Sequence, residues 1–218
     1  YGTNTPAVIQ RNILENPVWY TSYTPYQAEV SQGRLEALFV YQTMISDLTG
    51  LPLANCSLLD EATAAAEAVT MMRNLLSRDI VKAGVKRVLL DKKIFANTLD
   101  VMRTRAKGQD IELVMVDYAC VTSDWLAENG PFFGAIVQWP NADGAIEDYN
   151  AFIDDCHTAG MKVTVIADLM ALALLKPLNA DIMCGTAQRF GLPMGFGGPT
   201  AGYMATREEY KRDMPGRI

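Results

Sequence analysis

Five short runs of β-branched and apolar residues constrain the fold of this chain more than any other feature. They cover residues 85–90, 111–116, 133–139, 162–167 and 180–184. The stretches between them have helix-forming composition, at 97–106, 123–128, 146–159 and 169–175. Because strands that alternate with helices at this spacing form βαβ units, the sequence predicts an α/β fold with a mostly parallel sheet covered on both faces.

Two further helices are predicted ahead of these units. Apolar residues recur every three or four positions over 33–49, and a Gly-Leu-Pro stop signal follows. Residues 60–78 are rich in Ala, Met and Leu, begin with acidic residues and end on Arg, which suits the two ends of a helix dipole.

Residues 1–32 are dense in Tyr, Pro, Thr and Asn and predict an ordered N-terminal arm. The domain organisation is therefore predicted as this arm followed by a large α/β domain over 33–218. The chain lacks an initial Met and stops just after a Pro-Gly turn, so we expect a fragment truncated at both ends.

Charge and hydropathy exclude two kinds of partner. The chain has 19 Lys and Arg against 25 Asp and Glu, a formal net charge of -6, so it offers no broad basic surface for nucleic acid. Its longest apolar run, at 169–175, is far shorter than the about 20 residues that span a bilayer. We expect neither a nucleic-acid nor a membrane partner.

The supply of metal ligands is small. The single histidine, His157, and four isolated cysteines do not form the closely spaced clusters that zinc sites need. We expect no metal site. Cys56, Cys120, Cys156 and Cys184 are predicted to be reduced fillers of the core. His157, near the end of a predicted helix, is predicted to be a solvated residue favoured by the helix dipole.

The glycine-rich segment 195–202 superficially resembles a dinucleotide-binding loop. That fingerprint opens a helix, whereas a strand pattern, Ala-Gly-Tyr-Met-Ala-Thr, follows the glycines here. The sequence therefore predicts a turn that permits close backbone approach. Signatures of P-loop NTPases, α/β-hydrolases and zinc proteases are also absent from the sequence.

Asp168 stands at the end of the strand predicted over 162–167. The carboxyl ends of parallel strands are where open α/β sheets bind ligands, so Asp168 is a functional candidate. An Asp at this place also commonly caps the helix that follows. Both interpretations stay open at this point.

Three long segments, 1–38, 57–68 and 185–218, closely resemble the P protein of the glycine cleavage system, specifically its amino-terminal half or first subunit. The last segment begins Gly-Thr-Ala-Gln-Arg-Phe and contains the glycine-rich turn. The resemblance implies the three-layer α/β/α large domain of the fold-type I pyridoxal-phosphate enzymes, of which aspartate aminotransferase is a member. It also implies that the parent protein has a second, catalytic half of similar fold.

The resemblance further implies that this half does not hold the cofactor. In the catalytic half, the Schiff-base lysine stands in a His-Lys-Thr-Phe segment, and Gln188 occupies the place of that lysine here. The phosphate-binding helix of the catalytic half begins Asn-Ala-Gly-Ala. The corresponding stretch of this chain begins at Glu61 and includes Thr63. Asp60 and Glu61 would repel a phosphate at this helix terminus.

Other positions of the implied cofactor site are retained or altered. Asp168 matches the Asp that pairs with the pyridine nitrogen, and Phe95 falls near the position of a stacking His. Arg189 follows Gln188 directly. Together with Thr63, these residues are predicted to mark a vestigial cofactor site, and we expect no catalytic residue in this chain.

The activity implied by the resemblance is that of an oxidoreductase. The parent enzyme is expected to decarboxylate glycine with pyridoxal phosphate and to pass the aminomethyl group to the lipoyl arm of the H protein. This half is expected to be inactive alone and to complete an active site at its interface with the carboxyl-terminal half or second subunit. Four residues of the arm are predicted to line that site: Tyr1, Thr3, Thr24 and Tyr26.

Two alternatives remain at this point: a non-catalytic scaffold, and a stand-alone pyridoxal-phosphate enzyme of the same fold. The missing lysine argues against the second. The compartment implied by the resemblance is the cytoplasm for a bacterial parent and the mitochondrial matrix for a eukaryotic one.

Overall fold

A seven-stranded mixed sheet forms the centre of the computed structural model, which describes residues 4–19, 28–198 and 200–216. The strand order is β1-β7-β6-β5-β4-β2-β3. Strands β2 to β6 pair in parallel, whereas β7 runs antiparallel to both β6 and β1. The strands are β1 (Leu53–Ala54), β2 (Arg87–Asp91), β3 (Glu112–Val116), β4 (Gly134–Trp139), β5 (Lys162–Ala167), β6 (Ile182–Thr186) and β7 (Gly202–Thr206).

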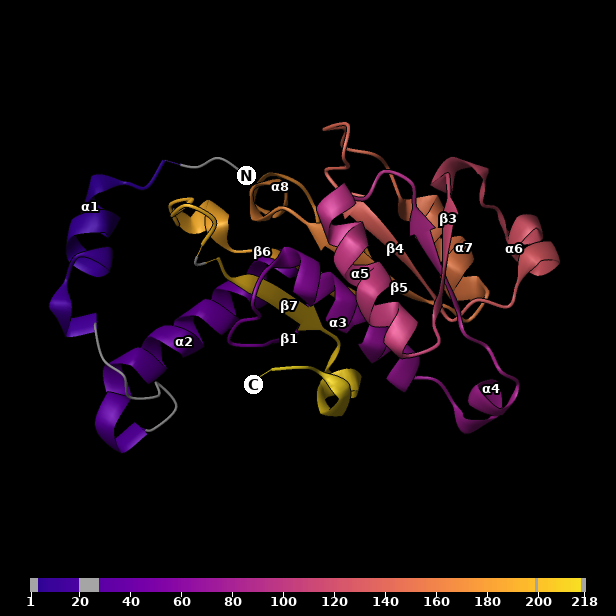
Figure 1. Ribbon diagram of the computed structural model, residues 1–218, viewed down its shortest axis with the longest axis horizontal. Coiled ribbons are helices and arrows are strands. Elements are labelled where there is room, and N and C mark those ends of the chain that lie inside the picture. The colour runs from indigo at the N-terminus through magenta and orange to yellow at the C-terminus, as the bar shows by residue number, and fades with distance from the viewer. Residues whose placement is uncertain (1–3, 20–27, 199, 217–218) are drawn as a thin grey trace.

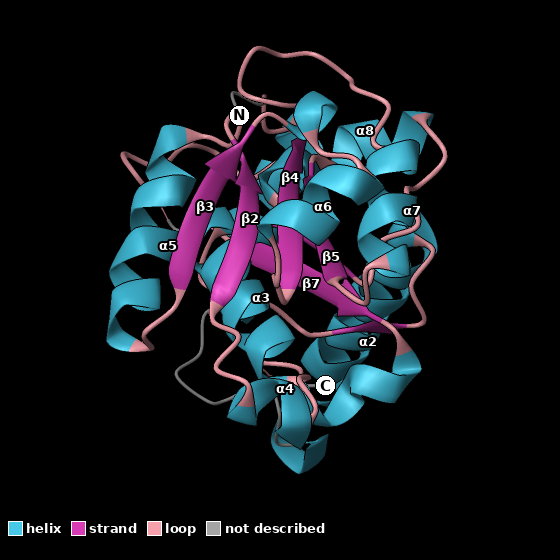
Figure 2. Ribbon diagram, turned by 90° about the vertical axis from the view of Figure 1, so that its right-hand side faces the viewer, coloured by secondary structure: helices cyan, strands magenta, loops and turns pink. Residues whose placement is uncertain are grey.

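Helices cover both faces of this sheet, so the predicted three-layer α/β/α architecture is confirmed (Figures 1 and 2). The side chains of α3 and α5 pack on one face, and those of α2, α6, α7 and α8 pack on the other. The α-helices are α1 (Ala7–Ile9), α2 (Ala28–Thr49), α3 (Glu61–Asn74), α4 (Arg78–Lys82), α5 (Ala96–Gly108), α6 (Ser123–Asn129), α7 (Asn150–Thr158) and α8 (Leu169–Leu174). Shorter helical turns are η1 (Gln10–Leu14), η2 (Pro17–Trp19), η3 (Tyr118–Cys120), η4 (Gln188–Phe190) and η5 (Glu208–Asp213).

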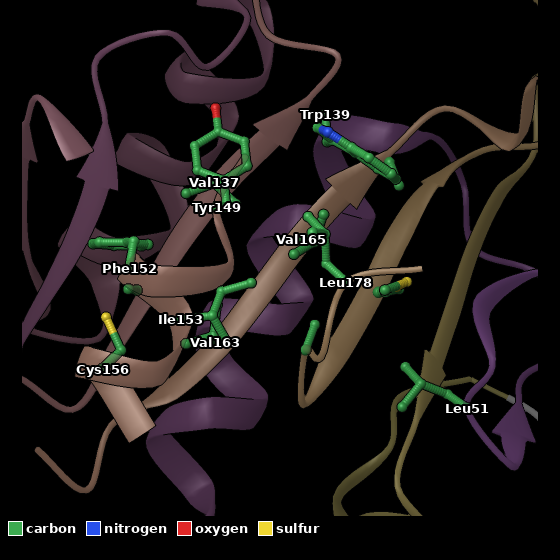
Figure 3. Packing of buried hydrophobic residues seen from close by; sticks show 14 of the residues in the cluster. Leu51, Val137, Trp139, Tyr149, Phe152, Ile153, Cys156, Val163, Val165 and Leu178 are labelled. Carbon is green, nitrogen blue, oxygen red and sulfur yellow. The ribbon is translucent and has the colours of Figure 1, made fainter. Parts of the chain in front are cut away.

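Two hydrophobic cores result from the alternation of side chains along the strands. Along β5, Val163 and Val165 enter one core while Ile166 enters the other. Figure 3 shows the first core, where Phe152 and Ile153 of α7 pack near the β5 valines. Because the central strands are buried on both faces, they are almost continuously apolar, which is why the sequence pattern located them.

Several element boundaries differ from the predictions. Helix α2 begins at Ala28, not at residue 33, so it crosses the predicted boundary between arm and domain. The helix predicted over 60–78 ends at Asn74, and a separate helix, α4, begins at Arg78, where Ser77 is the N-cap and accepts the N–H of Ile80 (3.4 Å). Strand β1 was not predicted, since its two residues are too short to show a pattern.

Helix α7 begins at Asn150 rather than at residue 146. Ahead of it, the side chain of Asn141 accepts the N–H groups of Asp143 and Ala145, each at 3.0 Å, and forms a turn. Helix α8 ends at Leu174, one residue before the predicted end. These differences move the ends of elements and leave the predicted order of strands and helices intact.

Two expectations about single residues need correction. Cys120 is exposed on η3, whereas Cys56, Cys156 and Cys184 are buried as predicted. His157 lies in the last turn of α7 as predicted, but its side chain is only one-quarter exposed, and Nε2 lies 2.9 Å from the buried carboxylate of Asp181. The local sequence gave no sign of this partner, because Asp181 lies 24 residues further along the chain.

The described residues contain no helix long and apolar enough to cross a membrane. Within the same residues, no group of three or more His, Cys, Asp and Glu side chains could hold a metal ion.

Candidate functional site

A polar pocket of about 420 Å³ lies at the carboxyl end of the parallel strands. Open α/β sheets bind their ligands at this edge. The pocket is formed by the N-terminus of α3, the segment that leads into α5, the end of β6 and the glycine-rich loop. Its lining residues are Asp60, Glu61, Ala62, Phe95, Asn97, Thr186, Gln188, Gly197 and Thr200.

The N-terminus of α3 contributes negative charge to this pocket. Asp60 is the N-cap, and its carboxylate accepts the N–H of Thr63 at 2.7 Å. The Thr63 hydroxyl donates to the same carboxylate oxygen. Glu61 adds a second acidic side chain in the first turn. Because both carboxylates stand at the positive end of the helix, they oppose the binding of a phosphate there.

Gln188 lines the pocket at the start of η4, which follows β6. The residue is only 8% exposed, and its backbone N–H donates to the Thr186 hydroxyl at 3.2 Å. Its carbonyl accepts the N–H groups of Gly191 and Leu192, each at 3.1 Å. The side-chain amide is not a nucleophilic amine, and none of the described residues that line the pocket is a lysine.

Asp168 and Arg189 form a partly buried ion pair next to Gln188. Arg189 Nε lies 3.0 and 2.9 Å from the two carboxylate oxygens of Asp168, and Nη2 lies 2.8 Å from Oδ2. The same carboxylate accepts the N–H of Met170 at 3.0 Å and caps α8, which confirms the capping interpretation. The carboxylate of Asp168 is therefore occupied by a guanidinium and a helix terminus.

The sequence did not predict this ion pair, but the topology accounts for it. Strands β5 and β6 are parallel neighbours, so their carboxyl ends lie side by side. Asp168 directly follows β5, and Arg189 follows β6 after two intervening residues. A buried carboxylate needs a cationic partner, and Arg189 stands at the adjacent strand end.

The glycine-rich loop forms one wall of the pocket and carries exposed apolar side chains. Gly195, Gly197 and Gly198 have positive φ angles, and a Cβ at Gly195 would lie 2.3 Å from the carbonyl oxygen of Gly198. This agrees with the predicted turn with close backbone approach. Phe196 is fully exposed at the tip of the loop, and Met194 is 66% exposed.

A second polar cluster fixes the segment that leads from β2 to Phe95. Lys93 Nζ lies 3.0 Å from Glu147, whose other carboxylate oxygen accepts the Tyr118 hydroxyl at 3.0 Å. These hydrogen bonds, with the Lys93 bond the strongest cause, lower the pKa of Glu147. At the end of β2, burial raises the pKa of Asp91.

The structure brings together some of the predicted site residues and leaves others apart. Phe95 and Gln188 line the pocket. Thr63 lies on the first turn of α3 beside it, and Asp168 pairs with Arg189 at the neighbouring strand ends. The sequence interpretation missed three polar lining residues: Asn97, Thr186 and Thr200. The position of Thr186 at a strand end is the signal that would have found it. Four predicted residues, Tyr1, Thr3, Thr24 and Tyr26, lie outside the described residues.

The mixed, mostly parallel sheet between layers of helices is the fold of the fold-type I pyridoxal-phosphate enzymes. DndA from Streptomyces lividans superposes over 98% of this chain and 60% of its own, with a TM-score of 0.66 and 9% identity. A Campylobacter jejuni protein described as an O-acetylhomoserine (thiol)-lyase, solved with N'-pyridoxyl-lysine-5'-monophosphate, superposes over 81% of this chain and 41% of its own, with a TM-score of 0.61 and 15% identity. At these identities the likeness shows the fold alone.

Sequence comparison narrows this class to one family. The family model for the glycine cleavage system P-protein matches residues 1–218, and the chain belongs to this family. It is 59% identical over its whole length to the glycine dehydrogenase (decarboxylating) of Bacteroides fragilis strain YCH46, and 53% identical to the mitochondrial enzyme of Solanum tuberosum. It spans 23% and 20% of the lengths of these relatives.

A solved structure of the same family agrees. The inhibitor-bound crystal structure of glycine decarboxylase, the P-protein of the glycine cleavage system, superposes with a TM-score of 0.83 and 36% identity. The match covers 99% of this chain and 48% of that one.

Proposed function

We propose that this chain is the cofactor-free part of a glycine dehydrogenase (decarboxylating), and that it completes an active site whose cofactor the remaining part of the enzyme holds. Membership of the P-protein family supports the activity. The single observation that carries the cofactor-free role is the pocket itself, because it has the location of a cofactor site and lacks the groups that would hold the cofactor.

The residues present do not fit pyridoxal phosphate. Gln188 lacks the amine that would form a Schiff base. The N-terminus of α3 is capped by Asp60, so a phosphate there would meet a carboxylate instead of free N–H groups. Asp168 is already paired with Arg189 and has no free carboxylate oxygen to offer a ring nitrogen. We therefore assign no catalytic step to this pocket.

In this proposal, the residues of the chain shape and enclose a neighbouring site. The remaining part of the enzyme binds pyridoxal phosphate, which supplies the chemistry for decarboxylating glycine, and a lipoylated H protein accepts the aminomethyl group. Tyr1, Thr3, Thr24 and Tyr26 are proposed to line that shared site. The exposed apolar tip of the glycine-rich loop, with Met194 and Phe196, is a surface suited to the interface.

The compartment is proposed by analogy with the relatives. The potato relative is described as mitochondrial, so a eukaryotic parent is proposed to lie in the mitochondrial matrix. A bacterial parent is proposed to lie in the cytoplasm.

The test uses the full-length parent enzyme with pyridoxal phosphate, lipoylated H protein and isotope-labelled glycine. We expect labelled carbon dioxide to be released and the aminomethyl group to appear on the H protein. Borohydride reduction followed by mass spectrometry should place the cofactor on a lysine outside residues 1–218. A cofactor adduct within residues 1–218 would refute the cofactor-free role, and absence of glycine decarboxylation would refute the activity.

A second measurement separates a site-completing part from a pure scaffold. Thr24→Val and Tyr26→Phe should lower turnover while leaving the assembly of the parent enzyme unchanged. Thr104→Val, on the exposed face of α5, is the matched control and should leave turnover at the wild-type value. Wild-type turnover in all three variants would support the scaffold alternative.

A further inference from the structure

The outer face of α2 carries several large apolar side chains that the sheet does not cover. Phe39, Val40 and Met44 are 58%, 56% and 42% exposed. They lie on one side of α2 together with Glu36 and Asp47. Isolated apolar residues on a surface are ordinary, but three large apolar side chains on one face of one helix indicate an interface.

The described side chains of α2 are fully buried only in its C-terminal half. Among its described side chains, which begin at residue 32, the first buried one is Ile45, and Thr49 follows one turn later. The N-terminal half extends away from the sheet (Figure 1). Because a helix gains most of its stability from packing its apolar face, the exposed apolar side chains of α2 offer surface that a partner could cover.

Helical periodicity places the exposed groups on the side opposite the buried ones. At about 100° per residue, Glu36, Val40 and Asp47 fall within a narrow stripe, roughly 180° from Ile45. Phe39 and Met44 flank that stripe. The exposed face therefore has an apolar centre and an acidic residue at each end. Neither of these two carboxylates forms an ion pair with a described residue.

The charges decide between two occupants. If a second copy packed α2 against α2 in antiparallel fashion, Glu36 of one copy would lie opposite Asp47 of the other. In a parallel pair, each of the two acidic residues would face the same residue of the other copy. Like charges across such a helix pair are destabilising. A partner helix with basic residues flanking its apolar positions has no such penalty.

We propose that an amphipathic helix from the part of the parent enzyme outside residues 1–218, apolar in its centre and flanked by Lys or Arg, packs on the outer face of α2. The relatives are more than four times as long as this chain, so most of the enzyme is available to supply it. The proposal rests on the proposed function, in which this chain is one part of a larger glycine dehydrogenase.

The experiment places a photo-crosslinking amino acid at Phe39 of the full-length parent enzyme and identifies the cross-linked peptide by mass spectrometry. We expect a helical peptide from outside residues 1–218 that carries Lys or Arg next to its apolar residues. A cross-link to residues 1–218 of a second copy, or no cross-link, would overturn the proposal. This readout does not depend on activity, so an enzyme that fails to decarboxylate glycine but gives the expected cross-link refutes only the proposed function.

Amide hydrogen exchange provides a second readout on variants of the parent enzyme. The double variant Phe39→Glu and Met44→Glu should speed exchange of the α2 amides at least about tenfold. A buried charge in an apolar interface weakens the binding of the partner helix by at least this factor. The control pair, Ile80→Glu and Val81→Glu, changes exposed apolar residues of α4 and should leave α2 exchange unchanged. Equal exchange of α2 in both double variants would contradict the inference.

Discussion

Replacing Arg189 with Met should destabilise this chain markedly, because it leaves a buried carboxylate without its counter-ion. The Asp168 side chain is 5% exposed and receives three contacts from Arg189 at 2.8 to 3.0 Å. Methionine keeps the unbranched aliphatic stem but supplies no donor. Asp168 then keeps one side-chain hydrogen bond, from the N–H of Met170.

The size of the loss follows from the burial of the two partners. Removing one partner of a buried ion pair costs about 3–5 kcal/mol, and the 28% exposure of the Arg189 side chain reduces the expected loss to about 2–4 kcal/mol. For a domain of this size, such a loss corresponds to a fall in Tm of roughly 4–16 °C. Urea unfolding followed by circular dichroism measures the free energy directly.

The pH dependence identifies the cause of the loss. An unpaired buried carboxylate is relieved of its charge when it binds a proton, so the deficit of the variant should shrink as the pH is lowered from about 7 to about 4. Loss of packing alone would give a deficit that does not vary with pH. Asp168→Asn supplies the second arm of a double-mutant cycle, because Asn can still cap α8.

A matched control comes from an exposed ion pair. Lys211 lies 3.1 Å from Glu208, and both side chains are about 60% exposed. Lys211→Met should change the free energy of unfolding by less than about 1 kcal/mol. If Arg189→Met is no more destabilising than Lys211→Met at any pH between about 4 and 7, the role assigned to the buried pair is wrong.

Three further predictions concern the pocket, the polar cluster and the thiols. The variant Gln188→Lys alone should not bind pyridoxal phosphate, because the pocket still lacks a phosphate site. Such a site would supply charge-assisted hydrogen bonds of about 1.5–3 kcal/mol each. Saturation of aldimine absorbance at micromolar cofactor would contradict this prediction. Burial raises the pKa of Asp91 in the folded chain. The contribution of this carboxyl to stability is therefore greatest below its pKa in the unfolded state, and is lost as the pH rises through its pKa in the folded state. The stability of Asp91→Asn relative to wild type, measured by urea unfolding, should therefore increase as the pH rises from about 3 to about 7. A stability difference that does not change with pH would refute the raised pKa of Asp91. Alkylation near neutral pH should modify Cys120 in the folded chain and spare Cys156, whose pKa burial raises to about 12; equal labelling rates by mass spectrometry would show the opposite.

The order of strands and helices was predictable from the sequence because each depends on a local pattern. The parallel strands are short, continuously apolar and separated by helices, and this alternation admits few topologies. The cap at Asp168 was also predictable, since it satisfies an N–H group two residues away. The absence of a lysine at Gln188 is likewise a property of the sequence alone.

The tertiary structure alone decided which distant groups became partners. Arg189 meets Asp168, 21 residues earlier, because β5 and β6 end side by side, and His157 meets Asp181 across a similar separation. The start of α2 inside a Tyr- and Pro-rich segment and the exposure of Cys120 also lay beyond the local patterns. Helix and strand patterns arise from neighbours a few residues apart, whereas ion pairing and burial depend on how the packed sheet brings remote segments together.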